Sequence, residues 1–459
     1  MSSPLSLRLT PTLVLAALAL FAALAVVLST PDMVLQVAAI SITAVVFFAL
    51  RVVPEALTSL WSILAFLAIG AAPKEVIFSG FSTGGFWLLF SGLIIGGAIT
   101  QTGLGKLVAG RIFQHTGTSY SRAVILIAIT GMGLGMMIPS TIPRVIVLVP
   151  IAMALAEVMG YEKGSRGQIA LVITATTSTL LPTYTFLTAN MPTIIHYGAL
   201  ETLYGLHPSY ADYFVHQLPV NLVRFALILA LLLPLARTMP VADTVPDAPV
   251  QVMTAVQKRL AALLCLSILL WASDTWHGIS PAWVALGVAT VVLLPATGLL
   301  NKDAMKTNID LSPAFFLAGV FAISAVVAHI GLNTELADAI LPRLHLGEGS
   351  QFRDLYAIVG FSTAFSHLTT APAAPVVLAP LAMPMAEAAG WPVSTVAMAQ
   401  IIGIATPLLP YQAPPLIIGL ALSGIPSGML TRVCIGIGIG VFVIGLPLTY
   451  LWWQLIGAL

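Results

Sequence analysis

Long apolar runs separated by short polar stretches make up most of the chain. A membrane-spanning helix needs about 20 mostly apolar residues, and eleven runs fit that requirement. They are residues 11–29, 33–50, 55–72, 84–103, 166–199, 213–236, 256–273, 281–298, 311–331, 393–424 and 433–455. The pattern predicts an all-α polytopic membrane protein with about 11 transmembrane helices.

Two further apolar segments, residues 123–158 and 355–388, are interrupted in the middle by proline and hydroxyl residues. In the first, the arm after the interruption runs from Val145 to Val158. At about 1.5 Å per residue this arm is about 20 Å long, which is shorter than the hydrocarbon core of about 30 Å. We therefore expect two re-entrant hairpins rather than two pairs of spans.

The composition also indicates a membrane protein. Of the 459 residues, 59% are hydrophobic and 8% are charged, and the mean hydropathy is +1.02. A soluble fold could not bury this much apolar surface, so we expect the lipid bilayer to surround the chain. The net charge is +1 and the basic residues are dispersed among the loops, which gives no indication of nucleic-acid binding.

Lysine and arginine residues set the predicted orientation, because they concentrate on the cytoplasmic side of membrane proteins. With the N-terminus inside, most of them lie in the cytoplasm, while Lys74, Arg343 and Arg353 lie outside. The C-terminus then lies outside, and the linker 237–255, rich in proline and aspartate, lies in the cytoplasm.

An internal repeat divides the chain. LVPIAMALAEVMGY (148–161) aligns without gaps on LAPLAMPMAEAAGW (378–391), with identity at seven of fourteen positions. Leu180-Leu181-Pro182 matches Leu408-Leu409-Pro410, and Gly103-Leu104 matches Gly331-Leu332. In the predicted orientation the span 84–103 runs inward and its partner 311–331 runs outward, so the repeats are inverted. Many secondary transporters have this organisation.

The repeat predicts the domain organisation. Residues 1–83 are N-terminal scaffold helices, 84–236 are repeat 1, 237–255 are the linker and 256–459 are repeat 2. Each repeat contains a hairpin followed by a broken helix: 123–158 and 166–199 in the first, 355–388 and 393–424 in the second. The small residues Gly92, Gly96 and Gly97 on the span 84–103 are expected to permit close helix packing.

Four proline-containing breaks are the candidate site: PSTIPR (139–144), LLPTYT (180–185), SHLTTAPAAP (366–375) and TPLLPYQAPP (406–415). Proline frees backbone groups, which persist in a membrane only against protein or a polar cavity. Helix N-termini then favour an anion, and freed carbonyl groups suit a sodium ion. The candidate side chains are Ser140, Thr141, Thr183, Thr185, Thr369, Thr370 and Gln412. Possible sodium ligands, partly through carbonyl groups, are Pro139, Ser140, Thr141, Pro182, Thr369, Thr370 and Pro410.

Arg144 is unusual in so apolar a segment. A mid-membrane guanidinium group costs about 3 kcal/mol on insertion scales, but its planar fork suits a carboxylate. We expect Arg144 to bind substrate or to lie just behind the site; alternatively, it caps carbonyl groups at the break or pairs with an acid. Arg224 has two similar interpretations, as a second anion contact or as a pairing between helices. His367 is a candidate for binding substrate or a coupling proton, or for a structural role.

These motifs resemble the divalent anion/sodium symporter family (DASS), which carries di- and tricarboxylates or sulfate. The family has a Ser-Asn-Thr triplet at each hairpin tip. PSTIPR is similar to the Pro-Ser-Asn-Thr-Ala-Arg form of the citrate and dicarboxylate exchanger branch, matching at Pro139, Ser140 and Arg144, with Thr141 in place of asparagine. SHLTTAPAAPV is similar to that branch's Thr-His-Tyr-x-Thr-x-x-Ala-Pro-Val, with His367 in the histidine position. Because neither triplet is intact, sodium symport and anion exchange both stay open.

The resemblance implies a homodimer in a bacterial inner membrane and an elevator motion of a transport domain that carries both hairpins. We expect a secondary active transporter of small anions, with di- or tricarboxylates as the expected substrates, Na+ as the candidate coupling ion and no organic cofactor. Alternatives are a sulfate or sulfonate transporter and a passive anion channel or facilitator. An enzyme is not expected, because no nucleophile and base pair or other catalytic set is recognisable.

Overall fold

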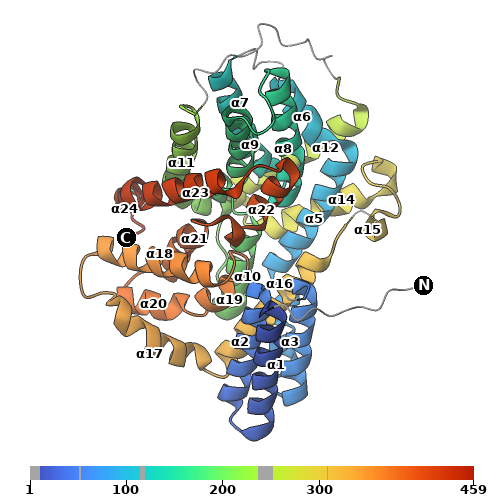
Figure 1. Cartoon of the computed structure of the whole chain (residues 1–459). Coiled ribbons are helices and arrows are strands. Elements are labelled where there is room, and N and C mark those ends of the chain that lie inside the picture. Colours follow the sequence, from blue (N-terminus) through green and yellow to red (C-terminus); the bar gives the residue numbers. More distant parts are fainter. Residues whose placement is uncertain (1–10, 51–52, 114–118, 236–251, 308) are drawn as a thin grey trace.

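The computed structural model describes residues 11–50, 53–113, 119–235, 252–307 and 309–459. The described part is built from helices joined by loops and turns, which confirms the predicted all-α class (Figure 1). Eight helices within the described ranges are long and apolar enough to cross a membrane. Most of the predicted linker, including Arg237, lies outside the described residues.

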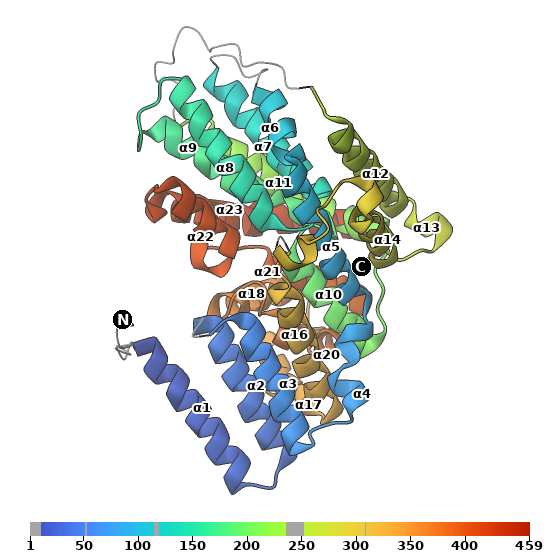
Figure 2. The ribbon, with the colours of Figure 1, turned by 90° about the vertical axis from the view of Figure 1, so that its right-hand side faces the viewer.

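One set of helices, which we call the flanking group, contains the N-terminal helices and those around the start of each repeat. It comprises α1 (Pro11–Ser29), α2 (Met33–Leu50), α3 (Glu55–Ile69), α4 (Lys74–Ile77), α5 (Gly84–Thr102), α12 (Ala255–Ala272), α13 (Asp274–His277), α14 (Pro281–Leu293) and α16 (Ser312–His329). Helices α1, α2 and α3 lie side by side at one end of the molecule, away from α7, α8 and α9 (Figures 1 and 2). Within the group, α3 packs along α16 and α5 packs along α14.

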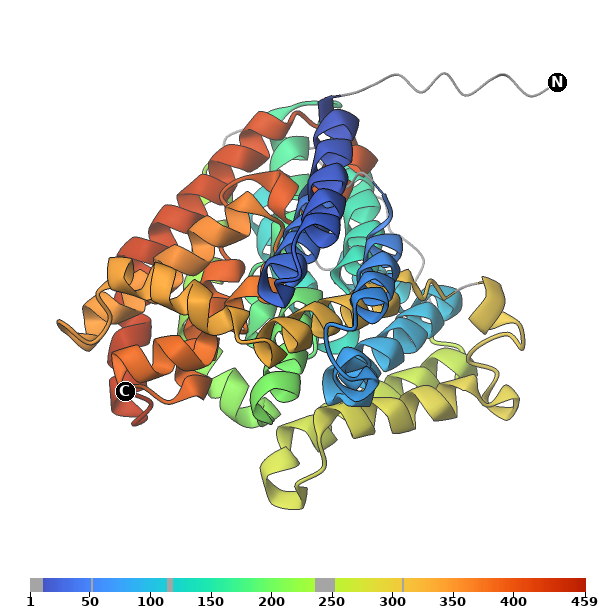
Figure 3. The same cartoon turned by 90° about the horizontal axis from the view of Figure 1, so that it is seen from below.

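A second set of helices, which we call the central group, follows α5 in the first repeat and α16 in the second. From the first repeat it contains α7 (Tyr120–Met137), α8 (Thr141–Val158), α9 (Arg166–Ser178), α10 (Met191–Tyr204) and α11 (Tyr210–Leu232). From the second it contains α18 (Gln351–Leu368), α19 (Pro375–Leu378), α20 (Ala382–Ala389), α21 (Val393–Ile404), α22 (Pro414–Ser423), α23 (Ser427–Gly440) and α24 (Leu446–Leu455). Helices α12 and α14 lie on the side of the molecule opposite α23 and α24 (Figures 1 and 3).

The order of elements repeats as the sequence predicts. Gly103 ends α5 and precedes α6 (Leu104–Phe113), and Gly331 follows α16 and precedes α17 (Leu332–Leu344). Both glycines have positive φ angles, 69° and 78°, a conformation that glycine adopts without steric cost. The matched Gly-Leu pairs of the two repeats therefore occupy equivalent turns.

The two predicted hairpins are helix pairs that fold back at residues 138–140 and 369–374, which we call the first and second tips. Helix α8 begins at Thr141 and not at Val145, because Pro143 is tolerated in a first helical turn. Its 18 residues rise about 27 Å, so the expected short arm is wrong for this pair. In the second pair the returning arm is divided between α19 and α20, of four and eight residues.

In the structure, each of the segments 166–199 and 393–424 contains two helices separated by an irregular segment. In the first, the segment 179–190 separates α9 from α10 and contains the 3-10 turn Pro182–Thr185. In the second, the segment 405–413 separates α21 from α22 and contains the 3-10 turn Pro410–Gln412. We call these segments the first and second breaks. The last span also changes its winding, through a π-helical turn at Val441–Gly445, immediately before Pro447 removes a backbone donor.

Small residues bring α3 and α16 into close contact. A Cβ atom added at Gly319 would lie 2.1 Å from Ser59 Cβ and 2.6 Å from Ser59 Cα. The hydroxyl of Ser59 donates to the carbonyl oxygen of Phe316 at 3.1 Å. The two backbones therefore pack at a separation that leaves no room for a methyl group.

We predict that Gly319→Ala destabilises the protein by about 1–3 kcal/mol, because the α3 backbone must shift to accommodate the new methyl group. The thermal midpoint of the purified protein in detergent measures this effect. The matched control is Gly287→Ala on α14, where an added Cβ atom meets nothing within 4 Å and alanine is the better helix former. Equal midpoints for the two variants would contradict the prediction.

Candidate functional site

Arg144 connects the first tip to the first break. Its side chain is fully buried in the first turns of α8. Nε donates to the carbonyl oxygen of Ser140 at 3.1 Å, and Nη2 donates to the carbonyl oxygen of Ala189 at 2.5 Å. Nη2 also lies 2.8 Å from Thr141 Oγ1 and 3.2 Å from Asn190 Oδ1. Nη1 is buried without a hydrogen-bond partner among the described residues.

Asn190 organises the same network, and sequence reasoning missed it. Its Oδ1 accepts from Thr141 Oγ1 at 2.8 Å as well as from Arg144, and its Nδ2 donates to Thr183 Oγ1 at 3.2 Å. Asn190 is the residue before the first turn of α10, which contains Pro192. An asparagine one residue before a proline-containing helix start is a recognisable N-cap signal, but the motif considered at this break ended at Thr185.

His367 connects the second tip to the second break. Its Nδ1 lies 2.6 Å from the carbonyl oxygen of Thr363, and its Nε2 accepts the backbone N–H of Leu408 at 3.2 Å. The imidazole in this arrangement is neutral with its proton on Nδ1. Tyr411 donates its hydroxyl to the carbonyl oxygen of His367 at 2.6 Å. His367 therefore holds backbone in the structure and does not line the cavity described below.

Gln412 satisfies the backbone of the second break. Its Oε1 accepts the N–H groups of Leu408 and Leu409 at 2.9 and 3.1 Å. Its Nε2 lies 3.3 Å from Ser366 Oγ, and its carbonyl oxygen accepts the N–H of Ala371 at 3.0 Å. The second tip and the second break are thus joined through side chain and main chain.

Arg224 is the second buried arginine of the central group. Its Nη1 donates to Asn221 Oδ1 at 2.7 Å, and its Nη2 donates to the Ile402 carbonyl oxygen and to Thr406 Oγ1, both at 2.9 Å. The side chain therefore joins α11 to the end of α21 and the second break. In the part of the chain that the structure describes, neither Arg224 nor Arg144 forms a salt bridge with an acidic side chain.

A small cavity of about 60 Å³ lies where both tips and both breaks meet. Its walls are residue 140 of the first tip and residues 141–142 at the start of α8, Leu180, Tyr184, Met191 and Pro192 around the first break, 371–372 of the second tip and 413–415 at the second break. Segments from both predicted repeats therefore line this cavity. Of the predicted site residues, Ser140 and Thr141 line this cavity, while Arg144 and Thr183 lie behind it.

Three helices begin at this cavity: α8, α10 and α22. Helix N-termini carry partial positive charge and free N–H groups. Here some of those N–H groups are missing, because prolines occupy early positions of all three helices. They are Pro143 in α8, Pro192 in α10, and Pro414 and Pro415 in α22. The cavity therefore receives three positive helix ends with fewer N–H donors than proline-free helix starts would supply.

The other predicted ligands are engaged locally. Thr185 Oγ1 donates to the carbonyl oxygen of Pro182 at 2.8 Å, and the carbonyl oxygen of Pro410 accepts the N–H of Ala413 at 3.3 Å. Thr369 Oγ1 lies 3.3 Å from the carbonyl oxygen of Phe365, and the carbonyl oxygen of Thr370 accepts two backbone N–H groups. The search of the described residues finds no group of three or more His, Cys, Asp or Glu side chains that could hold a metal ion.

A larger cavity of about 420 Å³, the vestibule, adjoins the first tip. It shares Ser140 and Ile142 with the small cavity and extends past Gly96 and Gln101 of α5 to Asp310. The predicted close packing holds for Gly92, where an added Cβ atom would lie 2.9 Å from Pro139 Cβ. It is wrong for Gly96, which faces open space and lines the vestibule.

We predict that Asn190→Ala destabilises the protein by about 2 kcal/mol or more, because Arg144, Thr141 and Thr183 all lose a buried partner. A fall of the thermal midpoint in detergent measures this loss. The control is Asn333→Ala on α17, because Asn333 is partly exposed, whereas Asn190 is fully buried. The prediction is wrong if both variants melt at the wild-type temperature.

Comparisons with known proteins place these features in a family. A family model described as the sodium:sulfate symporter transmembrane region matches residues 7–459. A membrane protein of Cupriavidus necator is 25% identical over 412 residues, covering 83% of this chain and 76% of that protein. The L-tartrate/succinate antiporter of Escherichia coli is 24% identical over 403 residues, covering 82% of this chain and 80% of the antiporter. The crystal structure of the Alcanivorax borkumensis YdaH transporter is similar in fold, with a TM-score of 0.60, 18% identity and coverage of 84% of this chain and 87% of that one.

Proposed function

Because the chain belongs to the divalent anion/sodium symporter (DASS) family, we propose that it exchanges small di- or tricarboxylates across a bacterial inner membrane. The family membership makes the protein an integral membrane transporter of small anions and not an enzyme. The substrate class, the exchange mode and the mechanism are the proposal. The homodimer remains a prediction from the resemblance.

The observation that carries the proposal is a pair of buried positive charges held by neutral amides. Asn190 contacts the guanidinium group of Arg144, and Asn221 contacts that of Arg224. An amide oxygen satisfies a donor but leaves the charge uncompensated, whereas an unpaired charge in a membrane costs several kcal/mol. Arg144 reaches the small cavity through Thr141, which lines it and accepts a hydrogen bond from the guanidinium group. An anion that enters this cavity recovers part of the cost of the Arg144 charge.

The sizes of the two cavities suggest how the anion reaches the site. Small-molecule pockets usually measure about 300–1,000 Å³, so the vestibule of about 420 Å³ fits a di- or tricarboxylate and the cavity of about 60 Å³ does not. Ser140 belongs to both cavities. We infer that the anion enters through the vestibule, meets the hydroxyl groups of Ser140 and Thr141, and occupies the inner cavity once the first tip moves.

The composition of the two cavities supports an elevator mechanism. Every wall of the small cavity belongs to the central group, so the site can move as one body. The vestibule, in contrast, lies between residues 140–143 of the central group and the flanking residues on α5 and before α16. Displacing the central group against the flanking group would close this path and carry the site with it.

Exchange is preferred over sodium symport because the carbonyl and hydroxyl groups at the breaks already have partners. Thr141 and Thr183 are bound to Asn190, and the carbonyl oxygens of Pro182 and Pro410 accept hydrogen bonds. A sodium ion would have to share or displace these partners. The exchange mode is also that of the E. coli relative, which is described as an L-tartrate/succinate antiporter.

We predict that purified protein in proteoliposomes takes up labelled succinate when unlabelled succinate is inside and sodium is absent. Uptake should require the internal anion, since exchange returns the carrier only when it is loaded. Accumulation that depends on an inward sodium gradient would replace exchange by symport. Inhibition by sulfate but not by citrate or tartrate would move the substrate class to sulfate, and uptake that never exceeds equilibration would indicate a passive facilitator.

We further predict that Asn190→Asp and Asn221→Asp each lower succinate uptake by about tenfold, equivalent to about 1.4 kcal/mol. A carboxylate at either position neutralises the adjacent guanidinium group while nearly preserving its shape, so the anion loses attraction and the fold is retained. Uptake in proteoliposomes and the thermal midpoint are measured together. The control is Asn333→Asp, which makes the same chemical change on α17. Full activity of both Asp variants would contradict the proposed role of the buried arginine charges in attracting the anion.

A further inference from the structure

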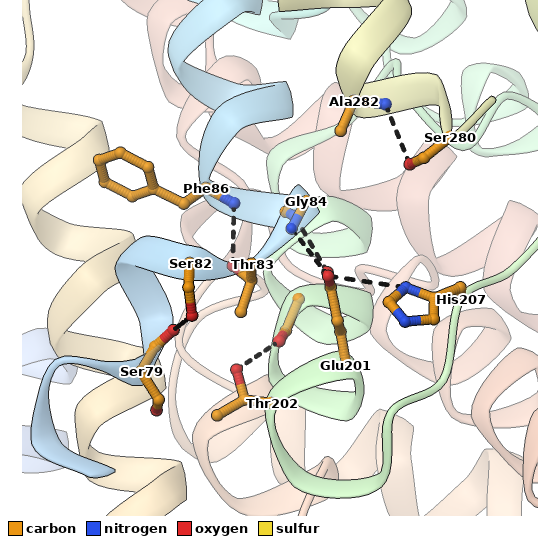
Figure 4. A network of polar contacts seen from close by, with 12 residues as sticks. Ser79, Ser82, Thr83, Gly84, Phe86, Glu201, Thr202, His207, Ser280 and Ala282 are labelled. Carbon is orange, nitrogen blue, oxygen red and sulfur yellow. Dashed lines mark hydrogen bonds and ion pairs between the residues drawn. The ribbon is translucent and has the colours of Figure 1, made fainter. Parts of the chain in front are cut away.

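Two carboxylates connect the central group to the flanking group, and each does so at the N-terminus of a helix. Glu201, near the end of α10, accepts the backbone N–H groups of Gly84 and Gly85 at 2.9 and 3.3 Å (Figure 4). Gly84 and Gly85 begin α5. Because α10 is central and α5 is flanking, this contact crosses the boundary between the groups.

The second contact crosses the same boundary in the opposite sense. Asp274 begins α13 of the flanking group, and its side chain is buried, with 6% of its surface exposed. Its Oδ1 accepts the hydroxyl of Ser209 at 3.0 Å, and its Oδ2 accepts the backbone N–H of Tyr210 in a short hydrogen bond. Ser209 and Tyr210 form the N-terminus of α11 in the central group.

Each group thus supplies a carboxylate to a helix N-terminus of the other. A carboxylate at that position binds free N–H groups and the positive end of the helix dipole. At α5 the arrangement is complete, because Thr83 Oγ1 accepts the N–H of Phe86 while Glu201 takes those of Gly84 and Gly85 (Figure 4). His207 lies 3.6 Å from Glu201 on the exposed side of this contact (Figure 4).

Both contacts lie at the end of the molecule that is opposite the vestibule along α5. Glu201 holds the first turn of α5, whereas the vestibule lies at residues 92–101, toward the other end of the same helix. In the predicted orientation the first turn of α5 faces outward and the vestibule faces the cytoplasm. The described conformation is therefore held together at its outer face and open at its inner face.

We propose that Glu201 and Asp274 are paired latches that stabilise the inward-open conformation and must release before the carrier turns outward. The inference rests on the proposed elevator motion, because only a displacement between the two groups makes the contacts conformation-specific. Release replaces two carboxylate contacts with water. Neutralising either carboxylate shifts the population away from the described conformation, and neutralising both shifts it further, because the contacts lie on different helices.

Thiol labelling of two positions tests the latches. The background is Cys265→Ser, since Cys265 is exposed and Cys434 is fully buried. Gly96→Cys reports the vestibule, where an added side chain meets open space. Ala282→Cys reports the outer face, because Ala282 of the flanking group is buried and lines a cavity of about 50 Å³ together with Gly198 and Glu201 of the central α10. A maleimide probe is applied to the purified protein in detergent without substrate.

We expect Glu201→Gln and Asp274→Asn each to slow labelling at Gly96→Cys and to accelerate labelling at Ala282→Cys, changing the ratio of the two rates by about fivefold or more. Glu335→Gln and Asp338→Asn, which neutralise exposed carboxylates on α17, should leave the ratio unchanged. If a latch variant does not fold, Ser209→Ala removes one hydrogen bond from Asp274 and should produce a smaller shift in the same direction.

An unchanged ratio in the folded double variant overturns the proposal. So does faster labelling at Ala282→Cys with no change at Gly96→Cys, since that result indicates local loosening of α5. The labelling assay contains no substrate, so its outcome is independent of the succinate experiment. Active exchange with an unchanged ratio refutes the latches alone, whereas a shifted ratio without uptake of any tested anion refutes the substrate assignment alone.

Discussion

The structure depends on satisfying backbone groups that proline releases inside an apolar environment. Lipid cannot hydrogen-bond a free N–H or carbonyl group, so each break needs side chains that supply partners. Arg144 and Asn190 meet this need at the first break, and Gln412 and His367 meet it at the second. These residues also fix the positions of the two tips. The shape of the cavity between the tips therefore follows from the need to give each free backbone group a hydrogen-bond partner.

The two repeats solve this problem with different chemistry. The first uses a cation, Arg144, to bind carbonyl groups, and its repeat partner is Ala374. The second uses neutral imidazole and amide groups to accept N–H groups, while the cation beside it, Arg224, comes from α11. The fold therefore repeats its order of elements but not its charges. An anion bound between the repeats would meet different chemical groups from each.

The fold was largely predictable because hydrophobic length and proline position determine it. Of the eight described helices that are long and apolar enough to cross a membrane, six coincide with predicted spans and two, α7 and α8, are the arms of a predicted hairpin. Irregular segments separate α9 from α10 and α21 from α22. The start of α8 was missed because proline is acceptable in a first helical turn, so Pro143 did not mark a boundary.

The candidate site was predictable only in part. Ser140 and Thr141 were identified because they lie next to a proline-containing break. Asn190 was missed because the motif considered at the first break ended at Thr185, before its N-cap signal. Asn221 was missed because its role depends on which helices meet, and a single sequence does not contain that information.

The prolines at the starts of α8, α10 and α22 have a consequence for turnover. Each one preserves the direction of a helix dipole while deleting an N–H group that would grip an oxygen atom. An anion bound at this cavity, as proposed, would be attracted by the helix dipoles and held by fewer directional hydrogen bonds. Such a site would favour modest affinity and a short residence time, and a carrier that unloads on both sides of a membrane needs fast release as well as binding.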